Sequence, residues 1–97
     1  MKLVWTARAK RELAEIVTHI WSDDPAAAKK IRGRTEHMAG HLKSHPFMGR
    51  VGAVSGTREA VPHPSYRIVY ELRDDTVFVL SVVHTARLWP PVAEDDI

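Results

Sequence analysis

Two extended runs separated by only two residues constrain this sequence more than any other feature. Residues 66–73 and 76–84 are rich in valine and other strand-forming side chains, and Asp74-Asp75 joins them. This spacing predicts a β-hairpin with a two-residue turn. Counting back from that turn places Arg67 opposite Val82. One face of the hairpin is then apolar and consists of Ile68, Tyr70, Leu72, Val77, Val79 and Val83.

The opposite face of the hairpin is predicted to be partly charged. It carries Arg67, Glu71 and His84 beside Val69. The apolar face is large enough to cover two amphipathic helices, so the charged face is expected to stay open, with Arg67 exposed on it. One extra residue in the loop would reverse this assignment, because a one-residue slip in register exchanges the faces of one strand relative to the other.

The first half of the chain predicts one strand and two helices. Residues 2–5 are apolar at alternate positions, and Thr6 follows them as a helix N-cap. Apolar side chains then recur at helical spacing to about Ser22. Asp24-Pro25 begins a second helix, which His45-Pro46 ends near residue 44.

The remaining segments complete an α+β fold. Residues 46–56 hold three of the five glycines and are predicted to form a loop, and residues 57–61 form a further strand. We therefore expect an N-terminal strand, two antiparallel helices and then an antiparallel sheet of three strands. Residues 1–91 form a single domain and residues 92–97 a short acidic tail.

Charge and composition limit the partners. The net charge is +2, but Glu94, Asp95 and Asp96 lie together, and without them 14 basic residues face 9 acidic ones. A basic body suits a nucleic acid or an acidic protein, although many solvated surfaces carry as much charge. No apolar run approaches the ~20 residues of a membrane span. The chain has no cysteine and begins without a secretory signal, so we expect a cytoplasmic protein.

Three histidines stand four residues apart on the second predicted helix: His37, His41 and His45. A pair with this spacing can hold a metal ion, but no cysteine or well-placed carboxylate completes a set. We expect a solvated face, with no metal and no cofactor.

The order of short motifs along the chain resembles the RelE/ParE family of bacterial toxins. These motifs are Gly49-Arg50, Gly56-Thr57-Arg58-Glu59, Tyr66-Arg67-Ile68-Val69-Tyr70 and His84-Thr85-Ala86-Arg87. The resemblance implies the toxin of a type II toxin–antitoxin pair, neutralised by a cognate antitoxin. It also implies one of two targets, mRNA on the ribosome for the RelE branch or DNA gyrase for the ParE branch.

Cleavage of RNA would require groups that this sequence offers as candidates. Arg58, Arg67 and Arg87 could hold and stabilise the scissile phosphate, because a guanidinium stays charged and matches phosphate oxygens. His84 and Glu59 could transfer protons. Lysine is absent after Lys43 and the last tyrosine is Tyr70, so His84 would serve where a later residue serves in RelE-like relatives.

Other interpretations of these residues stay open. Arg67 could form an ion pair with Glu59 or Glu71, and Arg58 with Glu59. The domain could also be a non-catalytic nucleic-acid-binding or protein-interaction module. For a toxin, we expect an acidic, amphipathic antitoxin segment to cover the basic sheet face or its rim and the helical pair. Loss of the Arg67 side chain is then expected to abolish toxicity without unfolding the domain.

Overall fold

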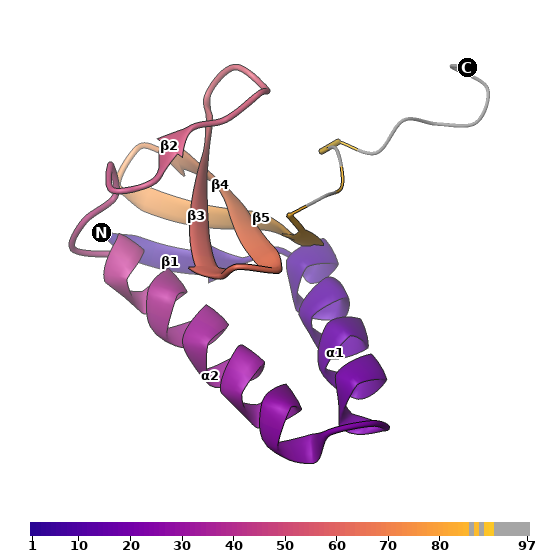
Figure 1. The fold of residues 1–97 in the computed structure, drawn as a ribbon. Helices are drawn as coiled ribbons and strands as arrows, with labels where there is room; N and C mark the ends of the chain where they lie inside the picture. The colour runs from indigo at the N-terminus through magenta and orange to yellow at the C-terminus, as the bar shows by residue number, and fades with distance from the viewer. Residues whose placement is uncertain (86, 88, 91–97) are drawn as a thin grey trace, which may run out of the picture.

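A computed structural model describes residues 1–85, 87, 89 and 90. The elements follow the order β1 (Lys2–Trp5), α1 (Ala7–Trp21), α2 (Pro25–Leu42), β2 (Arg50–Val51), β3 (Thr57–His63), β4 (Tyr66–Arg73) and β5 (Thr76–His84) (Figure 1). This is the predicted α+β architecture. The predicted acidic tail, 92–97, lies outside the described residues.

Both helices begin at the predicted caps. The Thr6 side chain accepts a hydrogen bond from the Ala9 amide at 3.2 Å, and Asp24 Oδ1 accepts one from the Ala27 amide at 3.1 Å. Each cap satisfies an amide that the first helical turn leaves without a partner. Figure 1 shows the helices as a hairpin on one side of the sheet, with its turn pointing away from the strands.

The sheet contains more strands than the sequence predicts. Its order is β1-β5-β4-β3-β2, with β1 parallel to β5 and the other neighbours antiparallel. The glycine-rich segment predicted to be only a loop contributes β2, which pairs Arg50 with Glu59 and Val51 with Arg58. Glycine content indicates a turn, but it does not exclude a two-residue pairing next to that turn.

The hydrophobic core lies between the sheet and the helix hairpin. Ala9, Ala39, Leu42, Ala60, Ile68, Tyr70, Val77 and Val79 form one buried cluster. The β4 and β5 members confirm most of the predicted apolar face, and Leu72 packs against them. Within the described residues, neither helix is long and apolar enough to cross a membrane.

The predicted register of the hairpin is right at the turn and wrong beyond it. Arg73 pairs with Thr76, so Asp74-Asp75 is the turn. The pairing then shifts, because Tyr70 faces Val79 while Val69 faces Ser81, which leaves Leu80 as an extra residue. Such a residue is a β-bulge. Arg67 therefore faces Val83 rather than Val82.

A glutamate on α1 stabilises this shift. Glu12 Oε1 accepts hydrogen bonds from Ser81 Oγ at 2.7 Å and from the Val82 amide at 3.3 Å, immediately after the extra residue.

Because paired residues share a face, His84 lies on the face of its partner Tyr66 and Arg67 lies on the opposite face. The prediction that Arg67 and His84 share a face is wrong.

Candidate functional site

Arg67 lies buried on the sheet face that points away from the helices. Its residue exposure is 9%, and that of Glu59 is 7%. Arg67 Nη1 and Nη2 donate to the carbonyl oxygens of Thr85 at 3.1 Å and Arg87 at 2.6 Å. Arg67 Nε lies 3.4 Å from Glu59 Oε1, which also lies 3.2 Å from Arg50 Nη2. The prediction that Arg67 is exposed is therefore wrong.

We call Arg50, Glu59 and Arg67 the arginine clamp. Arg67 ties the segment after β5 to the middle of the sheet, and Glu59 balances its charge. A guanidinium presents its donors in a fixed planar fork. A phosphate approaching Arg67 would have to displace backbone carbonyls that already occupy this fork. The clamp confirms the alternative in which Arg67 pairs with Glu59.

Arg58 belongs to a second cluster. Adjacent residues of a strand point to opposite faces, so Arg58 points away from Glu59 and does not reach the clamp. Its Nη1 donates to the Gly49 carbonyl at 2.8 Å, and its guanidinium lies 5.0 Å from the centre of the Phe47 ring. Arg58 thus holds the loop between α2 and β2.

Tyr70 supports the same loop from below. Its hydroxyl donates to the Pro46 carbonyl at 2.8 Å and accepts from the Gly49 amide at 3.0 Å. A Cβ atom at Gly49 would lie 2.6 Å from this hydroxyl, so the close approach requires glycine. Burial raises the pKa of Tyr70 above 10.0, while the Gly49 amide and the charge of Arg58 act in the opposite direction.

Replacing Tyr70 with phenylalanine should lower the free energy of unfolding by about 1–3 kcal/mol at pH 7, because it leaves the Gly49 amide and Pro46 carbonyl without this partner. The raised pKa adds a pH dependence. Above pH 10 the unfolded chain loses the tyrosine proton before the folded chain does, so wild-type stability falls there. Tyr70→Phe should fall less steeply over that range.

Urea unfolding of both proteins at pH 7 and at alkaline pH measures these effects. Tyr66→Phe is the matched control, since Tyr66 is the only other tyrosine. Equal losses in the two variants would mean that the Tyr70 hydroxyl does not support the loop.

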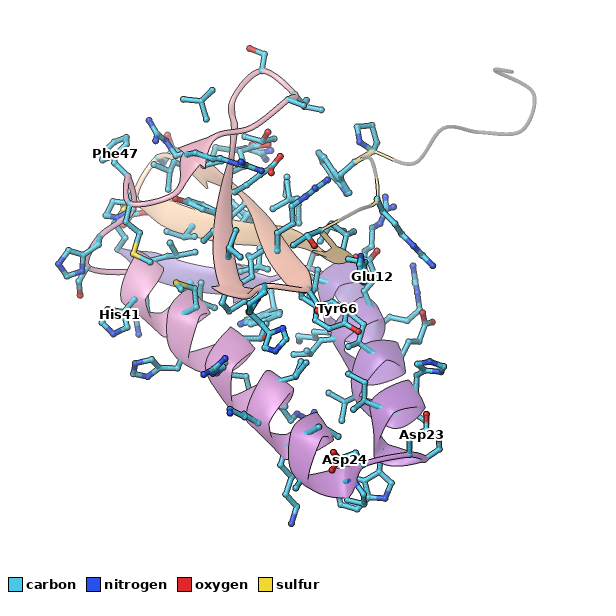
Figure 2. The ribbon with its side chains drawn as sticks, in the orientation of Figure 1. Glu12, Asp23, Asp24, His41, Phe47 and Tyr66 are labelled. Atoms are coloured by element: carbon cyan, nitrogen blue, oxygen red, sulfur yellow. The ribbon has the colours of Figure 1, made fainter. Side chains whose placement is uncertain are left out.

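His84 lies in a third place, beside a hollow between α1 and the ends of β4 and β5. The His84 and Tyr66 rings stand 5.6 Å apart between centres. The hollow has a volume of about 410 Å³ and is lined by Glu12, Glu15, Ile16, His19, Tyr66, Val82, Val83, His84 and Arg87. In Figure 2 the labelled Glu12 and Tyr66 lie on this side of the molecule.

The structure therefore divides the predicted site residues. Glu59 and Arg67 lie together, Arg58 holds a loop, and His84 and Arg87 border the hollow. Glu12 joins the hollow without having been predicted, because one glutamate among several charges on α1 gives no sequence signal. In the described part of the chain, no group of three or more His, Asp or Glu side chains could hold a metal ion.

This arrangement of strands and helices is shared with solved structures of small α+β proteins. The fold matches a solved chain described as the chromosomal ParDE TA system from P. aeruginosa, with a TM-score of 0.78 and 20% identity, over 87% of this chain and 95% of that one. It also matches a YoeB/ParE toxin from Agrobacterium tumefaciens, with a TM-score of 0.62 and 20% identity, over 87% and 98%.

Sequence comparison gives the family. Residues 3–89 match the model of the ParE toxin of the type II toxin-antitoxin system parDE, and the chain belongs to this family. It is 38% identical to Y4kP of Sinorhizobium fredii over 94% of this chain and 95% of that protein. It is 36% identical to toxin RelE2 of Caulobacter vibrioides over 90% and 98%. The protein is thus the toxin of a type II pair, with a cognate antitoxin as its partner.

Proposed function

We propose that this toxin acts by binding a protein target, DNA gyrase, and not by cutting mRNA on the ribosome. The observation that supports this choice is the burial of Arg67 in the clamp, where its guanidinium donates to two backbone carbonyls. Gyrase is the target that the resemblance to the ParE branch implies, and the family model that matches the chain is the ParE model.

The chemistry of RNA cleavage disfavours the alternative. A ribonuclease must place a phosphate-binding cation and a proton-transfer group around one scissile bond. Here Arg67 and His84 lie on opposite faces of the sheet, and Arg58 is engaged with the loop before β2, so of the three predicted arginines Arg87 alone lies beside His84, at the hollow. Inhibition by binding needs only an exposed complementary surface, so it does not require these side chains to meet.

Purified toxin can be assayed against both targets. We expect it to block the ATP-dependent supercoiling of relaxed plasmid by gyrase and to leave mRNA intact on translating ribosomes. His84→Gln should retain the block, because His84 has no proton to transfer in an inhibition by binding. Codon-dependent cleavage of the mRNA that is lost in His84→Gln, with supercoiling unaffected, would establish the nuclease instead.

A further inference from the structure

The loop between α2 and β2 presents apolar side chains to solvent. Phe47 is 69% exposed, Met48 48% and Val51 72%. Val51 pairs with Arg58, and the Arg58 guanidinium lies over the Phe47 ring. The side chains of Val51, Arg58 and Phe47 therefore belong to one surface. We call Phe47, Met48 and Val51 the Phe47 patch. Exposed apolar side chains that gather in one place indicate an interaction site more strongly than scattered ones.

The backbone beneath the patch is fixed. Tyr70 holds Pro46 and Gly49 through its hydroxyl, and Arg58 binds the Gly49 carbonyl and, at 3.4 Å, that of Phe47. The side chains are therefore exposed on a loop that is held from below. A surface ordered before binding loses little conformational entropy when a partner arrives.

A hollow continues the patch along α2. It has a volume of about 270 Å³ and is lined by Arg34, His37, Met38, His41, Met48 and Pro62. Met48 belongs to both the patch and the hollow. Figure 2 shows the labelled Phe47 and His41 on the same side of the molecule. An apolar side chain from a partner can enter this hollow while a neighbouring one lies on the Phe47 ring.

The charges around this surface are basic. Arg34 borders the hollow, and the side chains of His37 and His41 lie beside it. Arg58 lies over Phe47. Among the described residues, no Asp or Glu lines the hollow. Glu59 and its partner Arg50 point to the opposite face of the sheet from Val51 and Arg58.

We propose that the Phe47 patch and its hollow are the docking site of an acidic, amphipathic segment of the cognate antitoxin. Apolar side chains of that segment cover Phe47 and fill the hollow, and its carboxylates meet Arg34 and Arg58. The proposal rests on the pairing of this toxin with an antitoxin and not on the choice of gyrase as target. It moves the expected antitoxin contact away from Arg67, whose charge the clamp neutralises.

The test measures the dissociation constant of purified toxin and its antitoxin for matched variants. Phe47→Ala should raise the constant about tenfold or more, as loss of a central aromatic contact does. Trp21→Ala, another exposed aromatic at the far end of α1, should change it by about twofold or less. Val51→Asp and Val4→Asp form a second pair, on the opposite edge strands β2 and β1.

A substitution that removes a charge tests the same surface independently. Arg34→Gln should weaken the complex and reduce the loss of affinity between low and high salt, because one screened contact is removed. Unfolding midpoints of all variants should match the wild type, since the replaced side chains are exposed. A weaker complex at an unchanged unfolding midpoint then reports the loss of a contact with the antitoxin and not the loss of the fold.

Three results would overturn the proposal. Equal affinities for Phe47→Ala and Trp21→Ala would place the antitoxin elsewhere. If Phe47→Ala keeps full antitoxin affinity but no longer inhibits gyrase, the patch serves the target. If the free toxin is dimeric and Val51→Asp makes it monomeric without affecting the antitoxin, a second copy occupies the patch. Antitoxin affinity can be measured even if gyrase proves not to be the target.

Discussion

Arg67→Ala is expected to lower the free energy of unfolding by about 3 kcal/mol or more. Removing one member of a buried ion pair leaves the other charge without adequate compensation. Glu59 would keep only Arg50, whose own side chain is 71% exposed, and the Thr85 and Arg87 carbonyls would lose their donors. Loss of stability, and not loss of a phosphate contact, then explains any loss of toxicity in this variant.

Urea unfolding of Arg67→Ala and Arg73→Ala distinguishes the loss of a buried arginine from the loss of an exposed one. Arg73 is also a β4 arginine paired with a glutamate, Glu71, but its side chain is 65% exposed. Its removal should cost about 1 kcal/mol or less. The double variant Glu59→Gln with Arg67→Met should recover much of the lost stability, because it removes both buried charges. An Arg67→Ala protein as stable as Arg73→Ala would contradict the structural role of the clamp.

Local signals in the sequence were sufficient for both helices and for every strand except β2. The caps at Thr6 and Asp24 and the turn at Asp74-Asp75 each depend on residues within a few positions of one another. The bulge in β5 could not be predicted in this way. It is stabilised by Glu12, 69 residues before Ser81, and the surrounding valines fit either register.

In the candidate site, too, contacts between residues distant in the sequence could not be predicted. The motif order correctly placed Arg67 and Glu59 in neighbouring strands, and their pairing follows from that placement. Arg67 is held by the backbone carbonyls of Thr85 and Arg87, and no spacing in the sequence reveals these contacts. The role of Tyr70 was hidden for a similar reason. An aromatic residue in a strand predicts a core position, while its hydroxyl contacts depend on a loop more than twenty residues away.

Expression of this chain by itself is expected to stop growth, and co-expression of its cognate antitoxin should restore growth. The first half follows from the toxin family of the chain. The second follows from mass action, since an antitoxin in excess over the toxin, at concentrations far above the dissociation constant, leaves almost no free toxin. Colony counts with each gene under separate induction measure both halves.

Two variants and one control variant make this experiment specific to the structure. Arg67→Ala should relieve the arrest even without antitoxin, in proportion to the unfolded fraction that its lowered stability produces. Phe47→Ala should still arrest growth but require more antitoxin for rescue, because its fold is intact and its affinity for the antitoxin is reduced. Trp21→Ala should behave as the wild type in both conditions. Normal growth of cells that contain verified, folded wild-type protein would contradict the toxin assignment, since neither weak expression nor neutralisation could then explain their survival.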